Sequence, residues 1–97
     1  MSLRANAIER TALLPDGREA VVWVGVPNDP YIDRGELDTV AIELRVGGTV
    51  AAAINTILEP SQDSEARHLV DAVVRGLEDG SLEPTAGALE PLADSVL

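Results

Sequence analysis

Cysteine, lysine and phenylalanine are missing from this 97-residue sequence. The absence of cysteine and the scarcity of aromatic residues exclude certain structures and chemistries. Without cysteine there is no disulfide, no thiolate metal site and no cysteine nucleophile. Trp23 and Tyr31 are the only aromatic residues, so a core has to be built from Val, Leu, Ile and Ala. No apolar run approaches the roughly 18 residues of a membrane span. The sequence therefore predicts an aliphatic core without covalent cross-links and without a membrane-spanning segment.

Basic residues are also scarce. The seven cations, all of them Arg, stand against seventeen Asp and Glu side chains, which gives a net charge of −10 and an isoelectric point near 4.2. Such a charge repels phosphate backbones and anionic lipids, and no basic stripe along the chain overrides it. We therefore expect no binding to nucleic acid and no attachment to membranes. The acidity is explained most simply by solubility, and the alternative is docking to a basic protein partner.

Length and composition predict one small folded unit. Apolar residues make up 45% of the chain, which is enough for a core and too many for an acidic disordered segment. A core of this size is marginal alone, and self-association often supplies extra burial. The first six residues lack the apolar segment of a signal peptide, so we expect a cytoplasmic protein.

Two tight-turn signals divide the first half of the chain into expected strands. Pro15, Asp16 and Gly17 form one signal, and Gly47 followed by Gly48 forms the other. The runs on either side are rich in Val, Ile and Thr, which favour strands. We expect strands at about 4–13, 18–26, 37–46 and 49–58, arranged as a four-stranded antiparallel meander.

The second of these hairpins allows two registers. A strict two-residue loop places Val50 and Ile54 on the polar face of strand 37–46. A three-residue loop with a bulge keeps apolar residues on one face, and the apolar pattern therefore favours it. Its expected pairs are Val46 with Val50, Leu44 with Ala52 and Ile42 with Ile54. A helix starting at the three alanines 51–53 is a further alternative, which the β-branched neighbours disfavour.

A single amphipathic helix is expected at about 62–78. Its apolar residues recur at helical spacing: Ala66, Leu69, Val70, Val73, Val74 and Leu77. Ser61 is a suitable N-cap, and Gly80 suits the left-handed position that ends a helix. This stripe has to cover one face of the sheet. The sequence thus predicts an α+β domain over residues 1–80.

Residues 81–97 form a C-terminal tail with too many leucines for a solvated linker. Pro84 and Pro91 prevent one continuous helix, and each suits the first position of a short helical turn. We expect a partly helical tail in which Leu89 and Leu92 pack on the domain or on a partner subunit.

The second strand indicates an interface. Residues 20–26 are apolar on both faces, yet the chain offers one helix to cover one of them. Val21 and Trp23 point away from the face of Val22 and Val24, and they are covered either by the tail or by a second molecule.

Two other segments carry side chains of types that are common at functional sites. Residues 27–38 form an acidic loop whose spacing does not fit a calcium site, and its Tyr31 and Arg34 are candidates for partner recognition. His68, the only histidine, lies near Ser64 and Asp71 on the expected helix, away from any predicted pocket. We expect no enzyme, no catalytic residue, no cofactor and no metal site.

The sequence favours a small acidic protein that acts by protein–protein association, as a homodimer. The candidate interface residues are Val21, Trp23, Tyr31, Arg34, Leu89 and Leu92. A small-ligand binding or regulatory domain is one alternative. The other is an acidic inhibitor, of the immunity-protein kind, that binds a basic partner.

Overall fold

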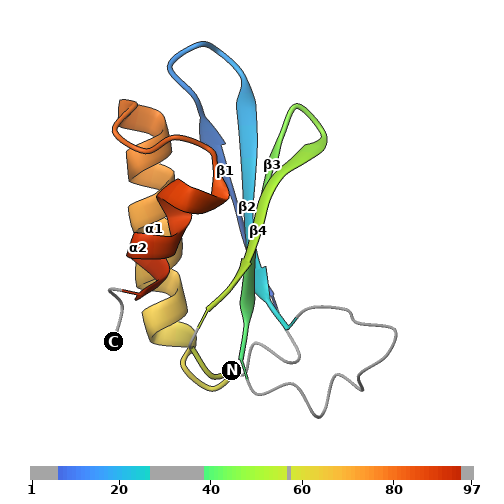
Figure 1. Cartoon of the computed structure of the whole chain (residues 1–97), viewed down its shortest axis with the longest axis vertical. Coiled ribbons are helices and arrows are strands. Elements are labelled where there is room, and N and C mark those ends of the chain that lie inside the picture. Colours follow the sequence, from blue (N-terminus) through green and yellow to red (C-terminus); the bar gives the residue numbers. More distant parts are fainter. Residues whose placement is uncertain (1–6, 27–38, 57, 95–97) are drawn as a thin grey trace.

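The computed structural model describes residues 7–26, 39–56 and 58–94 as a sheet covered by two helices. The elements are β1 (Ile8–Leu13), β2 (Glu19–Gly25), β3 (Ala41–Val46), β4 (Thr49–Asn55), α1 (Asp63–Asp79) and α2 (Ala86–Asp94). The strands are antiparallel and lie in the order β1-β2-β3-β4. Both helices lie on the same side of the sheet (Figure 1). The α+β class and the four-stranded meander are thereby confirmed.

The β3–β4 hairpin corrects the expected register in part. Gly47 and Gly48 have φ angles of 59° and 82°, so they form a two-residue loop that pairs Val46 with Thr49. Two consecutive positive φ angles suit glycine and match the twist of the strands, so the shorter loop is preferred. The bulge lies one step further along, between Leu44 and Arg45, and leaves Ala51 as the extra residue. It restores the predicted pairs of Leu44 with Ala52 and Ile42 with Ile54.

The core lies between the helices and one sheet face. Val22 and Val24 of β2 and Ile42 and Leu44 of β3 are almost fully buried there. The predicted helical stripe is buried against them: Ala66, Leu69, Val70, Val73, Val74 and Leu77. The period of 3.6 residues thus identified the buried side of α1 correctly.

Polar contacts fix how the chain passes between sheet and helix. Thr56, which is 5% exposed, donates from Oγ1 to the carbonyl of Val40 at 2.8 Å and accepts the N–H of Leu58 at 3.2 Å. Arg10 of β1 donates to Asp71 of α1 at 2.9 Å. At the start of α1, Gln62 rather than Ser61 is the N-cap residue, and its side chain accepts the N–H of Glu59 at 2.8 Å. The bonds of Thr56 and Gln62 satisfy backbone groups where regular pairing ends, and the bond of Arg10 joins β1 to α1.

The tail forms a regular helix that passes through a proline. We expected Pro91 to interrupt the tail, but α2 continues across it. The ring removes one helical hydrogen bond, the one that would reach the carbonyl of Gly87. Burial of Leu89 at 1% exposure and Ala93 at 2% anchors the helix on both sides of the proline. Tertiary packing therefore outweighs the local preference of Pro91.

Gly76 lets the chain fold back tightly after α1. A Cβ on Gly76 would lie 2.7 Å from Cβ of Leu82, and the N–H of Leu82 donates to the carbonyl of Gly76 at 3.0 Å. Gly80, with φ of 81°, ends the helix in the left-handed conformation. The side chain of Leu82 thus occupies the space that any larger residue at position 76 would need.

We expect Gly76→Ala to destabilise the fold by about 1–3 kcal/mol, because the new methyl displaces Leu82. Helix propensity alone favours alanine over glycine by about 1 kcal/mol, so the expected change in stability is opposite in sign to the propensity effect. Gly87→Ala in α2 is the matched control, since a Cβ there meets nothing within 4 Å. It is expected to be neutral or to stabilise by up to about 1 kcal/mol. Urea unfolding measures both variants, and equal stabilisation by both would contradict the close packing of Leu82.

Candidate functional site: the open face of the sheet

The sheet face opposite the helices, here called the open face, has no covering element within residues 7–26, 39–56 and 58–94 (Figure 1). The strand register places its side chains in four rows across the strands. Leu13 and Glu19 form one outer row, Gly25, Ala41 and Asn55 form the other, and two rows lie between them. The Trp23 row consists of Glu9, Trp23, Glu43 and Ala53, and the Val21 row consists of Thr11, Val21, Arg45 and Val50. Neighbours within a row lie close enough to contact one another across the strands.

The indole ring of Trp23 packs over Gly25 on the open face. A Cβ on Gly25 would lie 2.8 Å from Cζ2 of the Trp23 ring and 2.8 Å from Cβ of Ala7. The absence of a side chain at position 25 therefore provides the space into which the indole extends along β2. Trp23 and Val21 are half-buried, and Val50 is 50% exposed. The predicted pair of Val21 and Trp23 thus lies on one apolar surface, to which the structure adds Val50.

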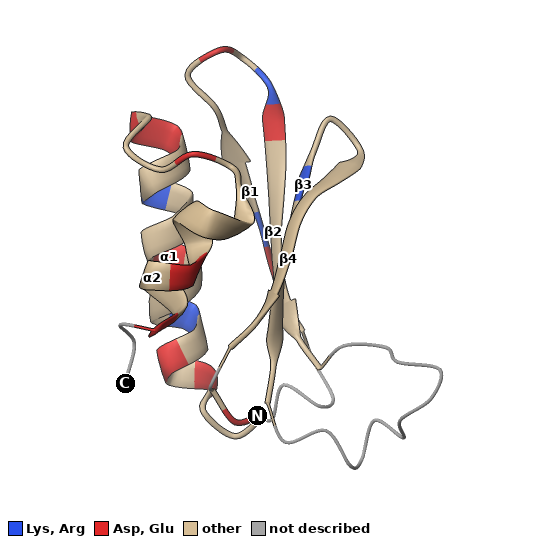
Figure 2. Cartoon of the chain, viewed as in Figure 1, with Lys and Arg blue, Asp and Glu red and all other residues tan. Residues whose placement is uncertain are grey.

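The open face belongs to the nearly neutral layer of the molecule. Residues 7–26 and 39–56 carry four carboxylates and three arginines, a net charge of −1. Residues 58–94, which include both helices, carry nine carboxylates and two arginines, a net charge of −7. Figure 2 shows the acidic segments gathered mainly along the helices, whereas β3 and β4 are largely uncharged. Among the described parts of the chain, electrostatic repulsion is therefore concentrated on the helical side.

One cation lies within the Trp23 and Val21 rows of the open face. Nε of Arg45 lies 3.5 Å from Oε1 of Glu43, with side-chain exposures of 57% and 26%. A separation of 3.5 Å is long for an ion pair, and an exposed pair of this kind contributes at most about 1 kcal/mol. Sequence reasoning did not identify Arg45 or Glu43. Their alternation along β3 was visible, but their position beside Trp23 depends on the β2–β3 register.

The other predicted interface residues do not lie on this face. Leu89 is a core residue of α2, the helix that contacts α1 and β4, and Leu92 is partly buried against the same core. In this structure α2 packs on its own chain, against α1 and β4. Tyr31 and Arg34 lie outside the residues that the structure describes, as does the whole acidic loop 27–38.

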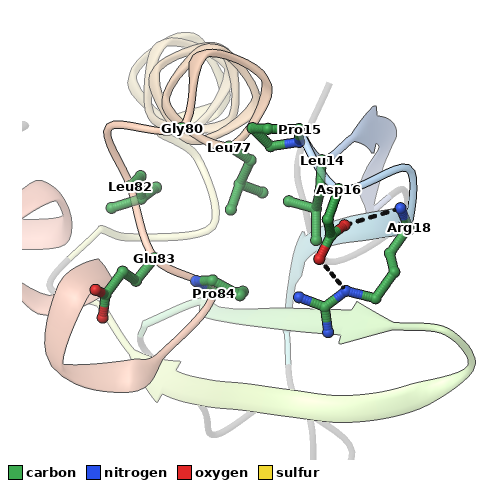
Figure 3. Close-up of a pocket in the computed structure, with 9 residues that line it drawn as sticks. All are labelled: Leu14, Pro15, Asp16, Arg18, Leu77, Gly80, Leu82, Glu83 and Pro84. Carbon is green, nitrogen blue, oxygen red and sulfur yellow. Dashed lines mark hydrogen bonds and ion pairs between the residues drawn. The ribbon is translucent and has the colours of Figure 1, made fainter.

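A shallow pocket lies at the end of the sheet near the β1–β2 turn (Figure 3). It has a volume of about 210 Å³ and is bounded by the apolar side chains of Leu14, Leu77, Leu82 and Pro84. Small-molecule sites usually measure about 300–1,000 Å³. The pocket is thus small for an organic ligand.

Asp16 and Arg18, at the edge of this pocket, bond to each other. The backbone N–H of Arg18 donates to Oδ1 of Asp16 at 3.0 Å, and its Nε donates to Oδ2 at 2.6 Å. The backbone bond, followed by the side-chain bond, holds the pKa of the Asp16 carboxyl below its ordinary value. These bonds stabilise the hairpin turn, and they occupy both oxygens of the carboxylate that a ligand would otherwise meet.

The histidine and the aspartate that the sequence placed together both lie on α1. Asp71 accepts a hydrogen bond from Arg10, and His68 is exposed on α1. Within the described ranges, no three His, Asp or Glu side chains are grouped so as to hold a metal ion. Nor does any helix in this part of the chain have the length and apolar character needed to span a membrane.

The open face is therefore the candidate functional site. Its features are an aromatic anchor, two exposed or half-buried valines and one ion pair, on the side of the molecule with little net charge. Known proteins add no information to this, because no family model, no curated protein and no solved structure matches the chain.

Proposed function

We propose that this protein acts by protein–protein association, as a homodimer that packs two open faces against each other. The observation that carries the proposal is Trp23, half-buried beside Val21 and Val50 on the open face. Apolar surface grouped around a tryptophan is typical of interface hot spots. Packing of two sheets face to face about 10 Å apart is a common way to bury such a surface.

Charge supports a second copy as the occupant. Two chains of net charge −10 repel each other, and the repulsion is smallest when their least charged surfaces meet. Among the described residues, the sheet layer, with a net charge of −1, is that surface. A dimer that joins two sheet layers also keeps the two helical layers far apart (Figure 1). Added salt screens the remaining repulsion, so the dimer is expected to persist as the salt concentration rises.

Trp23→Ala tests the proposal. Size exclusion with light scattering is expected to give twice the chain mass of 10.2 kDa for the wild type and the single-chain mass for Trp23→Ala. Loss of a hot-spot tryptophan weakens an interface by at least 2 kcal/mol, about 30-fold in Kd. His68→Ala, an exposed change on α1, is the control and is expected to leave the dimer unchanged. Circular dichroism checks that each variant is folded.

Trp23 also reports on the interface directly, because it is the only tryptophan in the chain. Its fluorescence emission is expected to shift to shorter wavelength as the protein concentration rises through the dimer Kd. A wild type that has the mass of one chain at every concentration and salt would refute the proposal. So would a Trp23→Ala dimer as tight as that of the wild type.

A further inference from the structure

The geometry of the open face points to the register of the homodimer, and the argument rests on the function proposed above. We infer that the two-fold axis crosses the strands between the Trp23 row and the Val21 row. In this arrangement Glu43 of each copy faces Arg45 of the other copy. The two resulting ion pairs make the interface specific for a second copy of this chain.

The two rows have matched compositions. On β2, β3 and β4, the Trp23 row reads Trp23, Glu43 and Ala53, and the Val21 row reads Val21, Arg45 and Val50. A two-fold axis between the rows places each row over the other row of the second copy. Glu43 then lies opposite Arg45, Ala53 opposite Val50 and, on β1, Glu9 opposite Thr11. The Cα of Trp23 lies opposite that of Val21, and the indole extends from there along β2 over Gly25. Each charge on β3 therefore has an opposite charge.

The other simple axis does not give this match. An axis that runs along the strands, between β2 and β3, places Trp23 over Glu43 and Val21 over Arg45 of the second copy. Each charge would then be buried against an apolar side chain, where it loses water without gaining a partner. The axis between the rows is therefore the one that the charges favour.

The contact between Glu43 and Arg45 within one chain leaves room for such a partner. Its two closest approaches, from Nε to Oε1 and from Nη2 to Oε2, are both 3.5 Å. A guanidinium has five N–H groups and binds a carboxylate best through two short parallel bonds. Arg45, with 57% of its side chain exposed, can therefore make stronger bonds to a glutamate of the second copy than it makes within its own chain.

Two charge variants test this register, each alone and then mixed. In R45E both positions carry carboxylates, and in E43R both carry guanidinium groups. Either variant alone places like charges opposite each other, and its self-association is expected to weaken about 30-fold or more. In an equal mixture the opposite charges meet, and a heterodimer with a Kd within about threefold of the wild type is expected. Native mass spectrometry distinguishes the heterodimer from both homodimers by mass.

The mixture separates this inference from a contact within one chain. R45E and E43R each lack the internal ion pair, so only a contact between copies explains why mixing them restores association. If either variant alone dimerises as tightly as the wild type, or if the mixture stays monomeric, the register is wrong while a wild-type dimer still supports the proposed function. If the wild type itself is a monomer, both the register and the proposed function are refuted.

Discussion

Replacing Leu89 with alanine is expected to destabilise the protein by about 2–5 kcal/mol, the range for removing a buried leucine side chain. Leu89 is 1% exposed and belongs to the same core cluster as the buried residues of α1 and of the sheet. The helix that carries it is short, and its first turn depends on Thr85, whose carbonyl accepts the N–H of Leu89 at 3.1 Å. A nine-residue helix is not stable alone, so loss of its anchor is expected to release α2 from the sheet.

Leu92→Ala is the matched control for this prediction. Leu92 lies on the same helix and is only partly buried, so its truncation is expected to destabilise the fold by about 1 kcal/mol. Urea unfolding followed by far-ultraviolet circular dichroism measures both variants. The difference in stability loss between Leu89→Ala and Leu92→Ala should persist in the Trp23→Ala background, because Leu89 packs within its own chain and not at the proposed interface. Equal losses for the two leucines would show that α2 does not complete the core.

The elements that the sequence predicted well are those in which local and long-range preferences agree. Helix α1 has an apolar stripe at helical spacing, acidic residues in its first turn and Gly80 at its end, so these local signals support the helix that packing requires. The strands flanking Gly47 and Gly48 are likewise rich in residues that favour strands. Four strands in a meander followed by a helix could therefore be predicted from the printed sequence.

Errors arose where one local signal competed with another or with packing. The apolar pattern of the second hairpin favoured a three-residue loop, but both Gly47 and Gly48 adopt positive φ angles and close a two-residue loop. The bulge lies one residue further from the loop, between Leu44 and Arg45, and it returns Ala52 and Ile54 to the core face. Pro91 locally disfavours a helix, yet burial of Leu89 and Ala93 on either side of it maintains α2.

The open face could be predicted only in part. Alternation along β2 placed Val21 and Trp23 opposite the helix, and this holds in the structure. Which residues flank them depends on the pairing of β2 with β3, and the segment that connects these strands is too long for its length to determine a register. Arg45 beside Val21 and Glu43 beside Trp23 are therefore information that the structure supplies. The leucines of the tail show the converse, because hydrophobicity alone does not distinguish a core residue from an interface residue.

Gly25→Ala is expected to alter the open face itself. The added Cβ would lie 2.8 Å from the Trp23 ring and 2.8 Å from Cβ of Ala7, so the indole has to move away from the sheet. Overpacking of this kind destabilises a fold by about 1–3 kcal/mol, although alanine is otherwise favoured over glycine in a strand. A ring displaced into water emits at longer wavelength, and the expected measurements are a red shift in Trp23 fluorescence and a lower urea midpoint.

A double-mutant cycle with Trp23→Ala isolates the contact between the added methyl group and the ring. Once the indole is removed, one of the two 2.8 Å contacts is gone, and Gly25→Ala in that background is expected to destabilise the fold by less than it does in the wild type. The remaining contact is with Ala7, and Ala7→Gly in the same background removes it. An equal loss with and without the indole would mean that position 25 disfavours alanine for a reason other than Trp23. A loss that depends on the indole would show that Gly25 is required because the tryptophan ring packs over it, and that the aromatic surface of the open face depends on this one small residue.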